Sequence, residues 1–222
     1  MNSICTVFLA TKASQKASTF TSAVRAINLV GMPTENHTNQ LFTSLDLELN
    51  QPSGKIIQVG ACVGNLKTGE VIDKLSVFVK IDEPLNPDII KLTGITEAQM
   101  LGGVSLFEAY EMLRSLHVKY ECFVNPIVWG GGDTSEIKKE LKAINPEWDE
   151  TNWCFGRRWI DVKTVLQVYC FSRNIKLQSG LAKSLIKVGL TFEGKKHNAL
   201  DDAVNTFRVA HKLVALIGVA PN

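Results

Sequence analysis

Three extended segments near the start of the regular part of the chain restrict the folds open to it. Residues 41–49, 55–66 and 71–80 are rich in apolar side chains, and short polar turns separate them. Strands joined by such short turns run antiparallel. The sequence therefore predicts a sheet that opens with two antiparallel hairpins.

Helical and extended patterns alternate in the remainder of the chain. A short helix and turn is expected over residues 87–96, and helical spacing of leucines predicts a helix over 105–117. Further expected elements are a buried strand over 122–130, a helix from Asp133 with that residue as its N-cap, a short strand over 158–162, and helices over 163–171, 179–188 and 199–216. This order predicts an α/β fold with a mixed five-stranded sheet flanked by helices.

Composition places the chain among soluble globular proteins. It has 222 residues, 45% of them hydrophobic and 21% charged, and no apolar run approaches the roughly 18 residues of a membrane span. Its five cysteines form no CxxC pair, and most lie among apolar neighbours. We therefore expect reduced core cysteines, an intracellular, cytoplasmic location and no membrane partner.

Residues 1–40 differ from the rest of the chain. They are rich in Ser, Thr, Ala and Asn, and no acidic residue precedes Glu35. This segment can be an organelle transit peptide, an over-long start before a true first residue at Met32, or an N-terminal helix around residues 21–30. We expect a non-catalytic appendage over 1–40 and one domain over 41–218.

Charge is unevenly distributed along the chain. Residues 1–150 contain 13 Lys+Arg and 18 Asp+Glu, whereas residues 151–222 contain 11 Lys+Arg and only 4 Asp+Glu. A basic segment beside an acidic one suits a nucleic-acid grip next to a metal site. The alternative is that these lysines only solvate helix faces.

Two carboxylates alternate with leucines in the first predicted strand. Asp46 and Glu48 are two residues apart and therefore share one face, while Leu45, Leu47 and Leu49 share the other. Adjacent anions repel one another unless a cation or protons bind them. The pattern indicates a cation site, although a solvated acidic edge would look the same.

Further acidic residues and one histidine stand at the ends of other predicted elements. His197 precedes the last helix, Asn198 can cap it, and Asp202 lies in its first turn. Asp133 follows the buried strand, after Gly130–Gly132, whose backbone can approach a ligand or a neighbouring chain closely. Helix capping alone would explain Asn198 and Asp202 at the start of the last helix, with His197 an exposed residue and no metal bound.

The ordered set of these residues resembles the three motifs of the DEDDh exonucleases. Asp46-x-Glu48, Asp133, and His197 with Asp202 five residues later match in order and spacing. The segments LDLELNQPSGKIIQVGA, LTGITEAQM, VWGGGD and GLTFEGKKHNALDDAVNTFRVA are similar to the branch of the enhanced-RNAi exonucleases and KapD-like proteins. The resemblance spans about residues 41–216 and implies a ribonuclease-H-like exonuclease fold.

The resemblance also implies a mechanism and a role for each residue. Two ions, Mg²⁺ or Mn²⁺, would bind about 3.5–4 Å apart. Asp46 would contact both ions, Glu48 and Asp202 would complete the coordination of the first ion, and Asp133 would hold the second through water. His197 would take the proton from the attacking water. Of the neighbouring Asp201 and Asp202, Asp201 is the less favoured metal ligand. Asp161 is expected to cap the helix that follows it.

The expected substrate is the 3′ end of single-stranded nucleic acid, with release of nucleoside monophosphates. RNA is slightly favoured over DNA because the matching branch includes RNA exonucleases. Alternatives are a DNA-directed exonuclease, an endonuclease of the same fold, and a catalytically idle nucleic-acid-binding protein. The residues expected to contact nucleic acid are Leu47, Leu49, Arg157, Arg158, Lys183, Lys187, Lys195 and Lys196. Leu49 stands where the resembling proteins often carry a small or hydroxylated residue that touches the terminal nucleotide.

Overall fold

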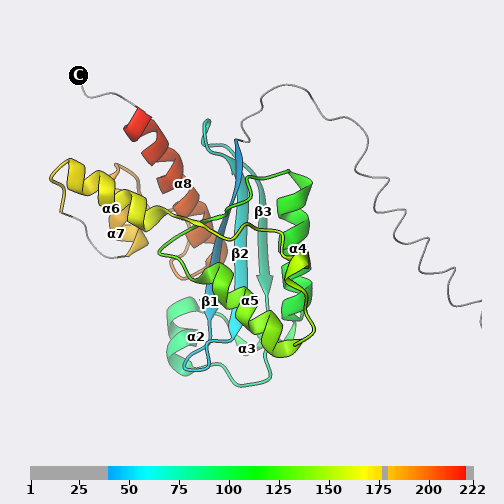
Figure 1. Ribbon diagram of the computed structural model, residues 1–222. Helices are drawn as coiled ribbons and strands as arrows, with labels where there is room; N and C mark the ends of the chain where they lie inside the picture. Colours follow the sequence, from blue (N-terminus) through cyan, green and yellow to red (C-terminus); the bar gives the residue numbers. More distant parts are fainter. Residues whose placement is uncertain (1–39, 177–179, 219–222) are drawn as a thin grey trace, which may run out of the picture. The chain divides into compact units, whose positions relative to one another are not determined.

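A mixed sheet of five strands forms the centre of the domain (Figure 1). The computed structural model describes residues 40–176 and 180–218. The strands are β1 (Leu41–Leu49), β2 (Ile56–Asn65), β3 (Val71–Phe78), β4 (Ile127–Val128) and β5 (Ile160–Asp161). Their order across the sheet is β3-β2-β1-β4-β5. The β1–β2 and β2–β3 pairs are antiparallel, as the hairpins predicted, and β4 and β5 continue the sheet in parallel.

Helices cover both faces of this sheet (Figure 1). They are α2 (Pro87–Thr93), α3 (Glu97–Leu101), α4 (Leu106–Lys119), α5 (Asp133–Ile144), α6 (Val162–Ser172), α7 (Leu181–Lys187) and α8 (Ala199–Gly218), with a 3₁₀ turn at Glu150–Asn152. Helices α4 and α5 pack on one face, and α8 packs on the other with α6 and α7 against it. The fold is the predicted mixed five-stranded sheet with flanking helices.

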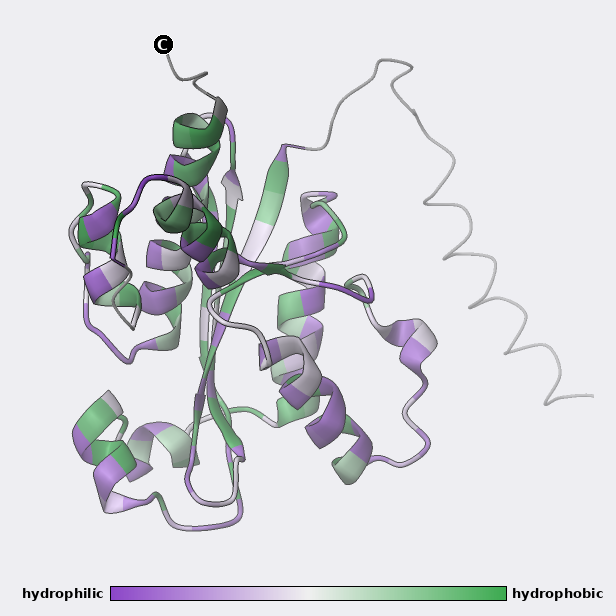
Figure 2. Cartoon of the chain, turned by 60° about the vertical axis from the view of Figure 1, so that its left-hand side comes forward, coloured by the Kyte–Doolittle hydropathy of each residue, from purple (hydrophilic) through white to green (hydrophobic). Residues whose placement is uncertain are grey.

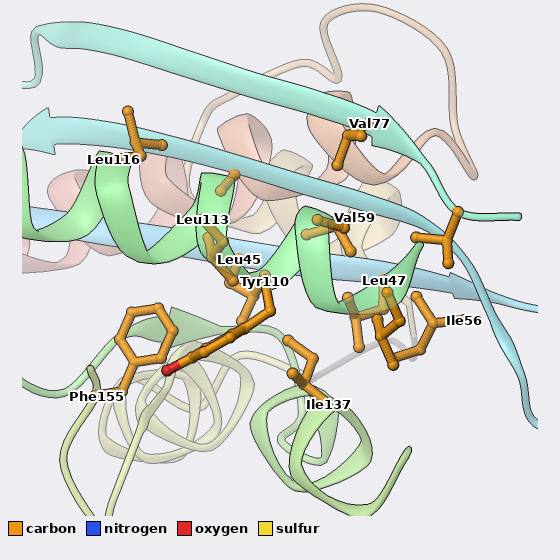
Figure 3. Close-up of a cluster of buried hydrophobic side chains, with 14 of the residues drawn as sticks. Leu45, Leu47, Ile56, Val59, Val77, Tyr110, Leu113, Leu116, Ile137 and Phe155 are labelled. Atoms are coloured by element: carbon orange, nitrogen blue, oxygen red, sulfur yellow. The ribbon is translucent and has the colours of Figure 1, made fainter. Parts of the chain in front are cut away.

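The core under α4 and α5 is built from alternate residues of the strands. Leu45 and Leu47 point from β1 toward these helices, where they meet Leu113 of α4 and Ile137 of α5 (Figure 3). Leu45 is fully buried and Leu47 is 8% exposed. Because side chains alternate across a strand, burying these leucines turns Asp46 and Glu48 toward the opposite face.

The opposite face of the sheet carries a second core. Phe207 and Leu213 of α8 pack there with Leu166 of α6, Leu185 of α7 and Cys62 of β2. Helices around the sheet mix hydrophilic and hydrophobic residues, as expected of helices that bury one side only (Figure 2). This core fixes α8 directly over the strand face that bears the acidic residues.

The structure corrects two predicted elements, the strand over residues 122–130 and the turn after α2. The strand expected over residues 122–130 is limited to Ile127–Val128. Pro126 lacks the N–H that a strand residue donates, and the glycines from Gly130 onward adopt positive φ angles, so extended pairing ends on both sides. The turn expected after α2 contains a further short helix, α3, which a Thr96–Gln99 capping box begins.

Several expectations concern residues that the structure does not describe. The appendage over residues 1–40 lies outside the described part except for Gln40, as do Met32 and Cys5. Cys62, Cys122 and Cys170 are buried free thiols, as expected of core cysteines, and Cys154 is half-buried. Within residues 40–176 and 180–218, no helix has the length and apolar character needed to cross a membrane.

Candidate active site

The acidic face of β1 looks toward the start of α8. Ser44, which precedes Asp46 and Glu48 on the same face, donates its hydroxyl hydrogen to the carbonyl of Ala203 in α8 at 2.8 Å. Glu48 pairs with Gln58 across the β1–β2 ladder. The Gln58 side chain is fully buried, and its Oε1 accepts the N–H of Ala199 at 3.1 Å. These contacts attach the first turns of α8 to β1, which carries Asp46 and Glu48, and to its neighbour β2.

A glycine in β2 permits this close approach. A Cβ atom at Gly60 would lie 2.0 Å from the backbone carbon of Ala199, so any side chain there would displace α8. The helix is capped as predicted, since Asn198 accepts the N–H of Asp201 at 3.2 Å. His197, just before the cap, adopts a positive φ of 59°, which is unusual for a residue other than glycine. Its backbone N–H donates to Asp202 Oδ2 at 3.1 Å.

Three of the predicted site residues form a compact group. One ligand atom each from Glu48, His197 and Asp202 lies within 4.8 Å of the other two. Glu48 comes from β1, His197 from the loop before α8, and Asp202 from the first turn of that helix. Residues about 150 positions apart in the sequence therefore meet as the resemblance implies.

Asp133 stands at the start of α5, after β4, and its charge acts on Asp46 and Glu48. The sequence predicted Asp133 as the N-cap of α5, but Asp133 is the first residue of the helix. Gly132 occupies the cap position, so no side chain caps this helix. Gly130, Gly131 and Gly132 all have positive φ angles, which favour glycine. The close neighbour at Gly131 is Trp159, whose indole nitrogen would lie 2.6 Å from an added Cβ.

Burial raises the pKa values of all four candidate carboxylates, and the negative charges of the others contribute at Asp46 and Glu48. Burial, and then the negative charges of Asp133, Asp202 and Glu48, raise the pKa of Asp46 well above its usual value. Burial and the charges of Asp202 and Asp133 raise the pKa of Glu48 to about 7. Burial also raises the pKa of Asp133 and that of Asp202 to about 6. Close carboxylates with raised pKa values favour a bound cation or retained protons.

The sequence of the whole domain matches a known exonuclease family. The exonuclease family model named for ribonuclease T matches residues 42–210, which include all five site residues. The chain is a member of the DEDDh 3′–5′ exonuclease superfamily.

Curated relatives of this DEDDh member are nucleases of larger size. ERI1 exoribonuclease 2 of Mus musculus is 28% identical over 183 residues, which cover 73% of this chain and 26% of the relative. The 3′-5′ exoribonuclease 1 of the same species is 26% identical over 170 residues, covering 72% of this chain and 47% of the relative. This chain therefore spans between about a quarter and a half of the length of these relatives.

Solved structures share the fold of this DEDDh domain. The nuclease domain of 3′hExo, described as a DEDDh family member bound to rAMP, aligns with a TM-score of 0.65 at 20% identity and covers 83% of this chain and 96% of its own. Cell-death related nuclease 4 aligns with a TM-score of 0.69 at 14% identity, covering 80% of this chain and 64% of its own. The ribonuclease-H-like exonuclease fold is thereby confirmed.

The residues present fit the divalent metal ions that membership of this superfamily implies. The carboxylate oxygens of Asp46, Glu48, Asp133 and Asp202 are hard ligands of the kind that Mg²⁺ and Mn²⁺ prefer. Desolvation and mutual repulsion, which raise the pKa values of these groups, are costs that a bound cation offsets. The donor set suits such ions better than zinc, because it contains no cysteine and one histidine.

This electrostatic arrangement predicts a pH-dependent stabilisation by metal ions. Without a cation, the raised pKa values of Glu48 and Asp202 let the folded state keep protons that the unfolded state loses. The contribution of these carboxyl groups to the free energy of unfolding therefore falls as the pH rises from about 4 to about 7. A bound cation replaces those protons. The rise in Tm caused by a fixed Mn²⁺ concentration should therefore be larger at pH 7.5 than at pH 5.

Thermal denaturation at both pH values, with and without Mn²⁺, measures this difference. Buried His117, whose pKa burial lowers to about 4, affects stability in the same pH range but to the same extent with and without the ion. Comparing the metal-induced shifts therefore removes its contribution. An equal shift at the two pH values, or none, would contradict the metal site.

The residues expected to contact nucleic acid occupy several surroundings. Arg157, Arg158, Lys183 and Lys196 are exposed, and Lys187 is half-buried on α7. Lys195 is exposed as a residue, but its ammonium donates to the carbonyl of Thr93 at the end of α2, at 2.7 Å. The Leu47 side chain packs in the core and leaves only its backbone for a substrate, whereas Leu49 is partly exposed.

The structure adds contacts near the site that the sequence did not predict. Asp201 accepts the backbone N–H of Lys195 at 2.8 Å and thereby ties the loop before His197 to α8. Asp161 caps α6, as expected, and its Oδ1 also accepts the N–H of Gly130 at 2.9 Å. Gln58 carries no sequence signal for its contact with Ala199, because a glutamine in a strand is usually read as a surface residue.

Proposed function

We propose that this protein is a metal-dependent exonuclease that hydrolyses single-stranded nucleic acid from its 3′ end and releases nucleoside monophosphates. The observation that carries this proposal is the group formed by Glu48, His197 and Asp202, whose ligand atoms lie within 4.8 Å of one another, beside the buried Asp46, whose pKa burial and then the charges of Asp133, Asp202 and Glu48 raise. An idle binding protein of the same fold would have no need to retain all four repelling carboxylates, whose charge is costly to bury.

Each residue of the site has a separate task in this proposal. Asp46, Glu48, Asp133 and Asp202 would hold two ions, Mg²⁺ or Mn²⁺. When bound, such ions lower the pKa of water and stabilise the leaving oxygen of an in-line displacement. His197 would accept the proton of the attacking water. Its backbone N–H bond to Asp202 fixes the loop on which its imidazole is carried.

The substrate proposal rests on the relatives and on the exposed cations. The matched relatives include proteins named as exoribonucleases, and one solved neighbour is bound to rAMP. We therefore propose RNA as the preferred polymer, with DNA as the alternative. The exposed and half-buried cations would contact phosphates without reading sequence: Arg157, Arg158, Lys183, Lys187, Lys195 and Lys196. Leu49 and the backbone of Leu47 would lie nearer the terminal nucleotide.

A single assay tests activity and polymer together. Single-stranded RNA and DNA of the same sequence, each labelled at the 5′ end, are incubated with the protein in Mg²⁺, in Mn²⁺ and in EDTA. We expect a ladder of shortening products in either ion, faster for RNA, and none in EDTA. Faster cleavage of DNA would overturn only the preference for RNA. Binding without cleavage of either polymer would favour the idle nucleic-acid-binding protein.

A further inference from the structure

The loop that carries His197 is fastened to α8 by one buried amide. Asn205 is fully buried in the second turn of that helix. Its Oδ1 accepts the backbone N–H of Glu193 at 3.1 Å, and its Nδ2 donates to the carbonyl of the same residue at 2.7 Å. Nδ2 also donates to the carbonyl of Asp201 at 2.8 Å. One side chain thus binds both backbone groups of a loop residue and the helix itself.

Arg208, one turn further along α8, continues this attachment. Its guanidinium donates to the carbonyl of Thr191 at 2.9 Å and to Asn205 Oδ1 at 2.7 Å, and it pairs with the Glu193 carboxylate at 2.7 Å. Residues 191–197 are therefore held at their start by Arg208, in the middle by Asn205, and near their end by Asp201 and Asp202.

His197 needs such support because of its backbone. Its φ of 59° is disfavoured for a residue with a side chain, and conformations of this kind persist only where the surroundings impose them. A second constraint is Gly194, whose φ is +83° and at which an added Cβ would lie 2.4 Å from the Asp201 carboxylate. The loop thus follows a path that its own backbone does not prefer.

We propose that Asn205 is a positioning residue for the reaction, acting through His197. It holds the loop at Glu193 so that the histidine stays within 4.8 Å of Glu48 and Asp202. None of its hydrogen bonds is to the acidic cluster, so its effect passes through the loop. The assignment rests on the proposed nuclease function for its catalytic consequence, but its structural part can be tested without activity.

The first test measures the loop directly. Asn205→Ala leaves the backbone groups of Glu193 to water, because that residue is exposed, and the fold should survive. Hydrogen exchange of the peptide spanning residues 191–198 should accelerate in this variant. Thr206→Val is the matched control: Thr206 is equally buried on the same helix, and its hydroxyl has no hydrogen-bond partner among the described residues. Unchanged exchange in Asn205→Ala would overturn the attachment, whatever the activity of the protein.

The second test is a double-mutant cycle with His197→Ala. Asn205→Ala alone should lower kcat by about 10–100-fold with little change in KM, as is usual for groups that orient a catalytic residue. In the His197→Ala background, the same substitution should have no further effect, because the residue through which it acts is gone. An equal loss in both backgrounds, or no loss in either, would overturn the proposal.

A second variant covers the case in which Asn205→Ala does not fold. Arg208→Met keeps the aliphatic stem but removes the contacts with Thr191 and Glu193 at a half-buried position. It should accelerate exchange of the 191–198 peptide and lower kcat, again only when His197 is present. If the unmodified protein shows no nuclease activity, the proposed function is rejected. The hydrogen-exchange result would still decide whether Asn205 holds the loop to α8.

Discussion

Replacing Asp46 by alanine is expected to abolish cleavage while leaving the protein folded. Burial, and then the charges of Asp133, Asp202 and Glu48, raise the pKa of Asp46, and the variant lacks the oxygens with which it would hold the ions. Loss of metal-based charge stabilisation is worth several kcal/mol, so the rate should fall by at least about 10³-fold.

The stability of an Asp46 variant should depend on whether divalent ions are present. Without divalent ions, Asp46→Asn removes one of four repelling carboxylates and should keep or raise Tm. In Mn²⁺ it should lose most of the stabilisation that the unmodified protein gains. Asp73→Asn is the matched control, because Asp73 lies on β3 and bonds to Lys119 and Tyr120. Cleavage by Asp46→Ala at the normal rate would refute the metal site.

Replacing His197 by alanine is expected to lower turnover by about 10²–10⁴-fold, the usual contribution of a general base. The four carboxylates remain, so the Mn²⁺-induced rise in Tm should be largely preserved.

A second histidine on α8 provides the control. His211 lies further along the helix, where its ring contacts the carbonyl of Leu66 at 2.9 Å, and His211→Ala should keep the rate. Near-normal turnover by His197→Ala would leave this residue as a helix-preceding histidine without catalytic function. Loss of the metal-induced Tm shift would instead make it a ligand of the ion.

Local sequence rules predicted those parts of the site that depend on one element. The alternation of Leu45, Asp46, Leu47 and Glu48 fixes which side chains share a face, because a strand repeats every two residues. Asn198 as a cap and Asp202 in the first turn follow equally from helix chemistry. Bringing the two elements together required the family resemblance, since no local rule pairs positions so far apart.

Other features depended on contacts that no local pattern specifies. Asp133 was expected to cap α5, but the backbone of Gly132 takes the cap position and leaves the carboxylate at the first helical residue. The strand around Ile127 is cut short because Pro126 cannot donate to the sheet. Asn205 resembles any polar residue of an amphipathic helix until its partner Glu193, twelve residues earlier, is in place. The roles of the five site residues themselves stay predictions until the variants are assayed.

The measurement that most directly tests the central claim compares three forms of one single strand in Mg²⁺. The first ends in a free 3′ hydroxyl, the second carries a 3′ phosphate, and the third is circular. We expect the 5′-labelled first form to shorten as a ladder with release of nucleoside monophosphates, the second to be strongly protected, and the circle to stay intact. Cleavage of the circle, or release of internal fragments from the linear forms, would show an endonuclease and contradict the account.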